Sequence, residues 1–266
     1  KKRTLKIERG GSAVNMGQLG GGCRVIGVND GELYQEGTRT RRRTIGSTIN
    51  ARDIEQSVSH FDQGLSSGQV NPTSEEVHFT VAGSGACYIN GHRYELEAGS
   101  AAYVPPEAEC CFDAPYGDLE IVSVCCPQIA NSVFDLPPRT TPIDIQSAIP
   151  TRCLHERERE SLMTGIRSFK LLADKSVGCQ RVTQFIGLIP TSEAPPHYHT
   201  YEEALYVVEG RGVMWADGKE EPVEPGTCIY LPRQVSHPLK NLEATPIRLL
   251  GVFHPSGSPA VRYGDE

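Results

Sequence analysis

The sequence contains two copies of one unit, and this internal repeat restricts the possible folds more than any other feature. A shift of 127 residues aligns residues 75–110 with residues 202–237 without a gap. The identical pairs are Glu75/Glu202, Glu76/Glu203, Val81/Val208, Gly83/Gly210, Gly85/Gly212, Gly91/Gly218, Glu97/Glu224, Gly99/Gly226, Tyr103/Tyr230 and Pro105/Pro232. Glycines and a proline make up half of these pairs, so the turns of the two copies coincide. We therefore expect two copies of the same structure.

Short apolar runs bounded by Gly, Pro or Asp indicate that each copy is built of strands. These runs are rich in Val, Ile, Tyr or Phe and cover residues 77–82, 101–104, 119–124, 181–189, 204–208, 228–231 and 247–253. Residues 154–169 contain a stretch that predicts a short helix. Residues 54–65 also show helical spacing, but the repeat aligns Val58–Asp62 with the evident strand Phe185–Ile189. We therefore predict a strand over 54–62.

The length of 266 residues allows one large or two small domains, and the repeat favours two. A Pro-rich run over 136–142 separates the copies and predicts a semi-rigid connector. We place an N-terminal domain at 1–136, a linker at 137–150 and a C-terminal domain at 151–266.

Composition excludes several classes of protein. The net charge of −7 argues against general binding of nucleic acid, and we interpret the arginine cluster at 39–43 as a solvated loop or a partner-facing edge. No apolar run is long enough to span a membrane, and no signal peptide is visible behind the first residues. The nine cysteines form no C-x-x-C pair. They predict reduced, mostly buried thiols and a cytoplasmic protein.

The second copy carries a set of ligand-type residues. His197 and His199 lie two residues apart and share a strand face, while Glu203 opens the next strand. Glu202 is one residue out of phase and should face elsewhere. His237 follows on a later strand, so three imidazoles and one carboxylate can converge inside a barrel.

Such a ligand set suits one divalent transition ion, namely Fe, Mn, Ni, Cu, Co or Zn. One carboxylate against a doubly charged ion leaves a positive site that can hold an anionic substrate. On a six-coordinate ion, four protein ligands leave two positions for water, O2 or a bidentate substrate.

The spacing of His197, His199, Glu203 and His237 resembles the double motif of the cupin superfamily, and the whole chain resembles a bicupin. The resemblance implies an all-β fold of two tandem cupin barrels, which are double-stranded β-helices of the jelly-roll type. It also implies that these four residues bind the metal. At the same shift the first copy has Val70, Pro72, Glu76 and Cys110. We therefore expect a degenerate, metal-free N-terminal barrel, with a makeshift site of Glu76, His78 and Cys110 as the alternative.

The resemblance supports a metal-dependent enzyme, and we expect a dioxygenase or other oxygenase that acts on a small metal-chelating organic substrate. The alternative is a non-redox decarboxylase, isomerase or aminohydrolase, and a second alternative is a non-enzymatic cupin that binds small molecules. The expected partners are this substrate and O2, with no nucleic acid and no membrane. A homo-oligomer is expected at the level of the family.

Other residues are candidates for substrate contact or proton transfer. Glu203 could accept a proton, and His254 ends the last apolar strand near the expected cavity mouth. Gln184, Arg248 and Tyr201 are candidates for substrate binding, because an inward amide, guanidinium or phenol could anchor polar groups. The facing of these side chains is not determined by the sequence, because Pro195-Pro196 interrupts the strand phase.

Overall fold

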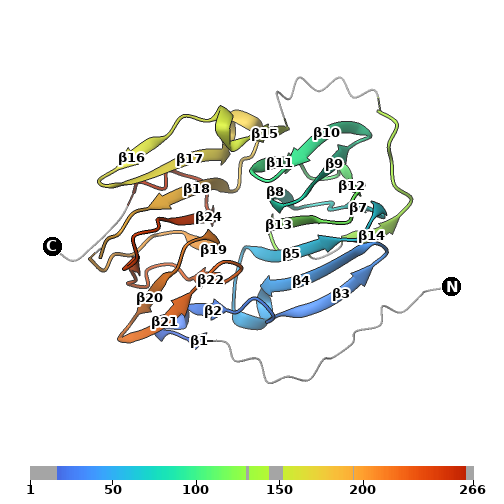
Figure 1. Cartoon of the computed structure of the whole chain (residues 1–266). Helices are drawn as coiled ribbons and strands as arrows, with labels where there is room; N and C mark the ends of the chain where they lie inside the picture. Colours follow the sequence, from blue (N-terminus) through green and yellow to red (C-terminus); the bar gives the residue numbers. More distant parts are fainter. Residues whose placement is uncertain (1–16, 130–131, 144–151, 194, 262–266) are drawn as a thin grey trace.

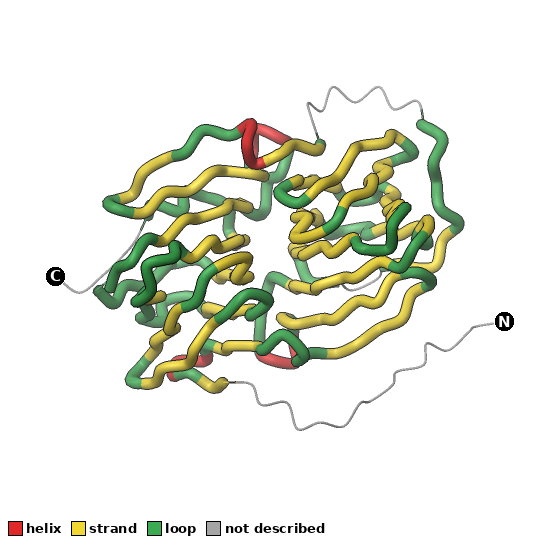
Figure 2. The backbone as a smooth tube through the Cα atoms, in the orientation of Figure 1, coloured by secondary structure: helices red, strands yellow, loops and turns green. Residues whose placement is uncertain are grey.

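Two β barrels lie side by side in the computed structural model, which describes residues 17–129, 132–143, 152–193 and 195–261 (Figure 1). Within the described residues the only helices are short 3-10 turns (Figure 2), namely η1 Gly20–Gly22, η2 Ser47–Ile49, η3 Glu156–Glu158 and η4 Lys175–Val177. The predicted all-β fold of two tandem barrels is confirmed. No helix in this part of the chain is long and apolar enough to cross a membrane.

Two sheets form the N-terminal barrel. The larger has the order β15-β11-β8-β13-β5-β4-β3. Its bounds are Cys153–His155, Ser100–Val104, Glu75–Ala82, Leu119–Cys126, Glu55–Phe61, Arg39–Ile45 and Glu32–Glu36. The smaller has the order β10-β9-β12-β7-β14, with β6 paired to β12. Its bounds are His92–Glu97, Ser84–Ile89, Glu109–Ala114, Gly68–Val70 and Val133–Leu136, with β6 at Gly64–Leu65. The strand predicted over 54–62 is β5.

The C-terminal barrel repeats this plan. Its larger sheet has the order β1-β2-β22-β19-β24-β18-β17-β16. Its bounds are Gly17–Gln18, Arg24–Ile26, Cys228–Leu231, Glu202–Glu209, Ile247–His254, Thr183–Ile189, Arg167–Ala173 and Leu162–Thr164. The smaller sheet has the order β21-β20-β23, with bounds Lys219–Val223, Gly212–Ala216 and Leu239–Lys240.

Each half of the chain gives short strands to the other half, namely β1 and β2 in one direction and β15 in the other. Strand β2 pairs with β22 of the C-terminal barrel, and β15 pairs with β11 of the N-terminal barrel. Figure 1 shows this exchange as blue β2 among the orange strands and yellow β15 beside green β11. The linker predicted at 137–150 lies between β14 and β15, partly outside the described residues. Both larger sheets therefore contain strands from both sides of the predicted linker. The domain boundaries at 136 and 151 stay a prediction.

The two larger sheets face each other across an apolar core shared by both barrels. Its fully buried members include Ile26, Ile54, Val77, Phe79, Val182 and Cys228. Separate apolar clusters fill the interior of each barrel. Strands such as β18 are therefore buried on both faces, because Ile186 points into the shared core and Phe185 into the barrel. This explains why such strands are continuous apolar runs rather than strict alternations.

Two glutamates that are identical in the repeat join the barrels at equivalent places. The Glu202 carboxylate accepts the backbone N–H groups of Arg52 and Asp53 at 2.8 and 3.0 Å. In the same way, the Glu75 carboxylate accepts those of Gln180 and Arg181, the shorter at 2.8 Å. Both glutamates are almost completely buried. Glu202 thus faces the other barrel, whereas Glu203 faces the opposite side of the strand. This agrees with the alternation of side chains along a strand.

Two sequence interpretations are corrected by the fold. Residues 154–169 form no α-helix, because β15, η3, β16 and the start of β17 occupy this stretch. The arginine cluster is not a solvated loop, because it forms strand β4. The side chains of Arg39 and Arg41 point into the N-terminal barrel and are buried beside the Glu36 carboxylate, which lies 3.0 Å from Arg41. Their charges are neutralised within the barrel and do not form a surface patch.

The nine cysteines are all free thiols, and only Cys153 is partly exposed. Burial raises the pKa of the Cys23, Cys126 and Cys153 thiols to about 12. Since the thiolate is the reactive form, native protein at pH 8 should resist alkylation. Intact-mass analysis with iodoacetamide should show fewer than about one label per native chain, and nine after denaturation. Rapid native labelling of two or more cysteines would contradict this expectation.

Candidate metal centre

Three histidines from two chain segments meet at the mouth of the C-terminal barrel. His197 and His199 lie in the segment before β19, and His237 lies between β22 and β23. The backbones of His197 and His237 pair as an isolated antiparallel bridge, with N···O distances of 3.2 and 2.8 Å. In addition, the N–H of Gln234 donates to the carbonyl of His199 at 2.7 Å. These bonds hold the two segments together without a regular strand.

The three imidazoles are arranged as metal ligands. One nitrogen of each ring lies within 4.8 Å of the others, which makes them the one group of this kind within the described residues. Every Nδ1–H donates to a backbone carbonyl; the acceptors for His197, His199 and His237 are Pro195 at 3.2 Å, Val261 at 3.3 Å and Val235 at 2.8 Å. This selects the tautomer with the lone pair on Nε2 and fixes the ring planes. The donor set therefore fits a divalent transition ion.

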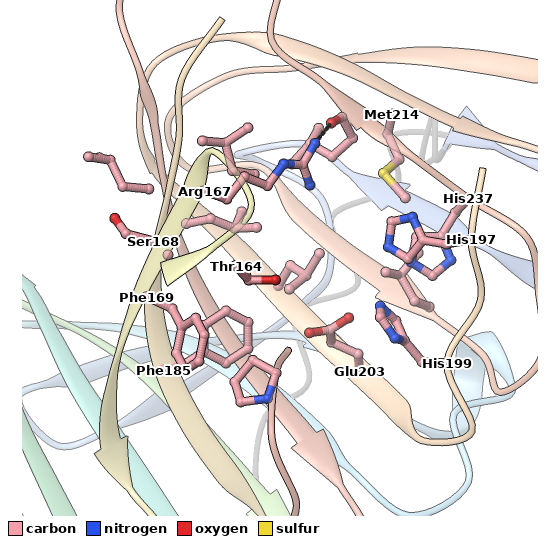
Figure 3. Close-up of a pocket in the computed structure, with 18 of the residues that line it drawn as sticks. Thr164, Arg167, Ser168, Phe169, Phe185, His197, His199, Glu203, Met214 and His237 are labelled. Atoms are coloured by element: carbon pink, nitrogen blue, oxygen red, sulfur yellow. Dashed lines mark hydrogen bonds between the residues drawn. The ribbon is translucent and has the colours of Figure 1, made fainter. Parts of the chain in front are cut away.

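Glu203 and Tyr201 line the same cavity. Figure 3 shows the Glu203 carboxylate turned into the cavity beside His199. The Tyr201 ring stacks between His199 and Phe253, at centroid distances of 4.4 and 4.1 Å. This sandwich supports the His199 ring from one side. All three histidines and the carboxylate expected to complete the ligand set thus face one space.

The cavity has a volume of about 90 Å³ and mostly apolar walls. Its wall residues come from strands on both sheets and include Phe169, Phe185, Leu205, Met214, Leu231, Leu239 and Leu249. Polar groups gather at one end with the histidines, and Thr164 and Arg167 lie at the opposite wall (Figure 3). A small organic molecule with an apolar middle and polar ends matches this lining.

Three of the predicted substrate or proton-transfer residues do not line this cavity. The fully buried Gln184 is on the opposite face of β18 from Phe185 and points toward the shared core. Arg248 pairs with Glu156 and, at 3.1 Å, with Glu209. His254 and Arg248 share the face of β24 that is turned away from the cavity and toward the other barrel, and the His254 Nδ1 donates to the Arg181 carbonyl at 2.8 Å. The sequence did not determine which side chains of these strands point into the cavity. The structure shows that those of Gln184, Arg248 and His254 do not.

Arg167, Thr164 and Ser168 line the cavity although sequence analysis did not select them. They come from the β16–β17 hairpin, which crosses the stretch interpreted as a helix. Arg167 is held by an Nη2 bond to the Leu239 carbonyl at 2.9 Å. A signal was present in the sequence, since Gly37 and Arg39 in the first copy match Gly165 and Arg167 at a shift of 128 residues.

The sheet register also corrects the alignment of the two metal motifs. The bridge between His197 and His237 corresponds to the pairing of Gln69 with Cys110 in the N-terminal barrel. His197 and His199 therefore match Gln69 and Asn71, not Val70 and Pro72. The reason is one additional residue between Asn71 and Glu75, which the gap-free alignment could not show.

In the N-terminal barrel these counterparts form a hydrogen-bonded cluster. The side-chain amides of Gln69 and Asn71 both donate to Glu76, the former at 2.7 Å. Burial raises the pKa of Glu76 to about 7 and lowers that of the neighbouring His78 to about 3. The Cys110 thiol lies 3.4 Å from that of Cys87, and within the described residues the only group of metal-ligand type is that of His197, His199 and His237. The described residues thus do not assemble the makeshift three-ligand site.

Comparisons with known proteins agree with the fold and the motif. A family model described as "Cupin domain" matches residues 185–253, which contain the three histidines and Glu203. Quercetin 2,3-dioxygenase of Bacillus subtilis is 27% identical over 156 residues, or 56% of this chain and 41% of that protein. L-ectoine synthase of Teredinibacter turnerae is 39% identical over 61 residues, which are 22% of this chain and 45% of that enzyme. The chain thus spans less than half the length of these relatives.

Solved structures show the same architecture at low sequence identity. Oxalate decarboxylase from Bacillus subtilis superposes with a TM-score of 0.70 at 13% identity, covering 93% of this chain and 78% of that structure. The protein Ylba from E. coli gives a TM-score of 0.67 at 14% identity, covering 87% of this chain and 90% of that structure. These similarities establish the two-barrel fold.

Proposed function

We propose that this chain, a member of the cupin superfamily, is a metal-dependent enzyme whose reaction takes place in the C-terminal barrel. The observation that carries the proposal is the histidine cluster, in which three rings of fixed tautomer converge beside Glu203 at one end of a cavity. An ion bound by His197, His199, Glu203 and His237 would supply Lewis acidity and, where it is Fe, Mn, Cu, Co or Ni, electron transfer.

We propose oxygenation of a small metal-chelating organic substrate as the reaction. The similarity to quercetin 2,3-dioxygenase supports this class, because the aligned part covers more than half of this chain. The apolar cavity wall would exclude water from the substrate. Glu203, which lines the cavity, would accept a proton from a substrate hydroxyl, and the stacked Tyr201 would hold His199 in position.

The experiment is to identify the metal in natively purified protein and to measure oxygen uptake with chelating diols and oxo acids. Substrate-dependent uptake with a redox-active ion would support an oxygenase. Turnover that proceeds without oxygen, or with Zn²⁺, would replace this proposal with the non-redox alternative of decarboxylation, isomerisation or aminohydrolysis. Protein that neither retains nor binds any of these ions would reject metal-dependent catalysis altogether.

A further inference from the structure

The two barrels contain the same hairpin at the wall opposite the metal motif. Strands β3 and β4 form it in the N-terminal barrel, and β16 and β17 form it in the C-terminal barrel. The sheet registers pair Glu36 with Arg39 and Thr164 with Arg167. Both turns contain a glycine with φ near +64°, namely Gly37 and Gly165. Each residue of one hairpin therefore has a defined counterpart in the other.

In the N-terminal barrel the arginine of this hairpin binds a carboxylate of the protein itself. Arg39 forms an ion pair of 2.5 Å with Glu36, and both side chains are buried. The Arg39 guanidinium also donates to Gln69, the counterpart of His197. In this barrel the carboxylate of Glu36, paired with Arg39, thus lies near Gln69, the residue that corresponds to a metal ligand of the other barrel.

In the C-terminal barrel the arginine is retained, but its acidic neighbour is replaced. Thr164 stands at the position of Glu36, and Phe169 stands at that of Arg41. Thr164, Arg167 and Phe169 all line the cavity that contains the histidines. Figure 3 shows Arg167 and Thr164 across the cavity from the histidines. The exchange of glutamate for the shorter threonine removes the carboxylate that this position provides in the other barrel.

We propose that the substrate is a carboxylic acid, and that its carboxylate binds Arg167 as Glu36 binds Arg39. A planar guanidinium recognises a carboxylate through paired N–H donors, and the Thr164 hydroxyl adds a further donor. The apolar walls then contact the carbon skeleton, and the other end of the molecule reaches the histidine cluster. This inference rests on the proposed function and adds the substrate class to it. It assigns to Arg167 the anchoring role that the sequence suggested for Arg248.

Binding of dicarboxylates to Co²⁺-loaded protein tests this assignment. The probes are malonate, succinate and glutarate, each compared by calorimetry with its mono-amide, which keeps one carboxylate for the metal and removes the other. At the length that spans the cavity, the diacid should bind at least about ten-fold more tightly than its amide. Arg167→Gln should abolish this preference. Thr164→Glu should weaken diacid binding by a similar factor, because the new carboxylate occupies Arg167.

Arg248→Gln is the matched control, since it removes an arginine from the same sheet on the face that does not line the cavity. This variant should keep the preference for the diacid. Equal binding of diacid and amide at every length, or a preference that survives in Arg167→Gln, would overturn the proposal. Co²⁺ titration of each variant reports metal binding separately. If the wild-type protein binds no Co²⁺, the proposed function fails. The affinities of the metal-free protein for butyrate and butyramide then still decide whether Arg167 binds a carboxylate.

Discussion

Replacement of His237 by alanine is expected to lower metal affinity by at least about 100-fold, since loss of an outer hydrogen-bond partner of a ligand alone costs 10–100-fold. His237 is almost fully buried, and its ring is fixed by the Val235 carbonyl. Its removal leaves the imidazoles of His197 and His199 without the third one that completes the cluster. Turnover should fall with metal occupancy, and Glu203→Gln should also weaken metal binding by removing the negative charge.

The measurement is metal content after dialysis, together with titration of each variant with Co²⁺ and circular dichroism as a check of folding. His254→Ala provides the matched control, because His254 is a histidine of the same barrel that does not line the cavity. It should bind metal like the wild-type protein. A folded His237→Ala variant with full metal content would show that the cluster is not the binding site.

Glu75→Gln should lower the stability of the protein, because Glu75 is a buried carboxylate that joins the two barrels. The Glu75 carboxylate accepts the N–H groups of Gln180 and Arg181 and the hydroxyl of Tyr103. A glutamine presents one acceptor and turns an NH2 group toward a backbone donor. Hydrogen bonds to charged groups contribute about 1.5–3 kcal/mol, so the free energy of unfolding should fall by about 2 kcal/mol. Glu202→Gln should have a similar effect from the other side of the interface.

Thermal unfolding checks this expectation, with a decrease in Tm of about 5 °C for a loss of this size in a chain of this length. Glu95→Gln is the control, because Glu95 is exposed and forms a surface pair with Arg93, which is worth at most about 1 kcal/mol. If Glu75→Gln unfolds at the same temperature as Glu95→Gln, the interface does not depend on these buried carboxylates.

Much of the fold followed from the repeat because turn chemistry is local. Matched pairs such as Gly83/Gly210 and Gly91/Gly218 take positive φ angles in both copies, which glycine adopts at little cost. The strand over 54–62 was predicted because its counterpart was evident. The stretch 154–169 was misread because β15 and β16 are only three residues long and β15 pairs with β11, which is far away in the sequence.

The ligand spacing was informative because it encodes strand phase directly. Residues two apart in an extended segment share a face, as His197 and His199 do, and Glu203 lies at the start of the following strand. The facing of Gln184 and Arg248 could not be predicted in this way. Both strands that carry these residues are buried on two faces, so hydrophobicity gives no indication of which side is the cavity.

The sequence by itself determined the two-copy all-β architecture, the histidine motif and its restriction to one half of the chain, because turns and strand alternation are local properties. The tertiary structure alone decided the exchange of β2 and β15, the match of Gln69 to His197, and the position of Arg167 in the cavity. These depend on the register between distant strands. A single inserted residue before Glu75 changes the register between distant strands of the N-terminal barrel. The register in turn determines which side chains lie next to one another.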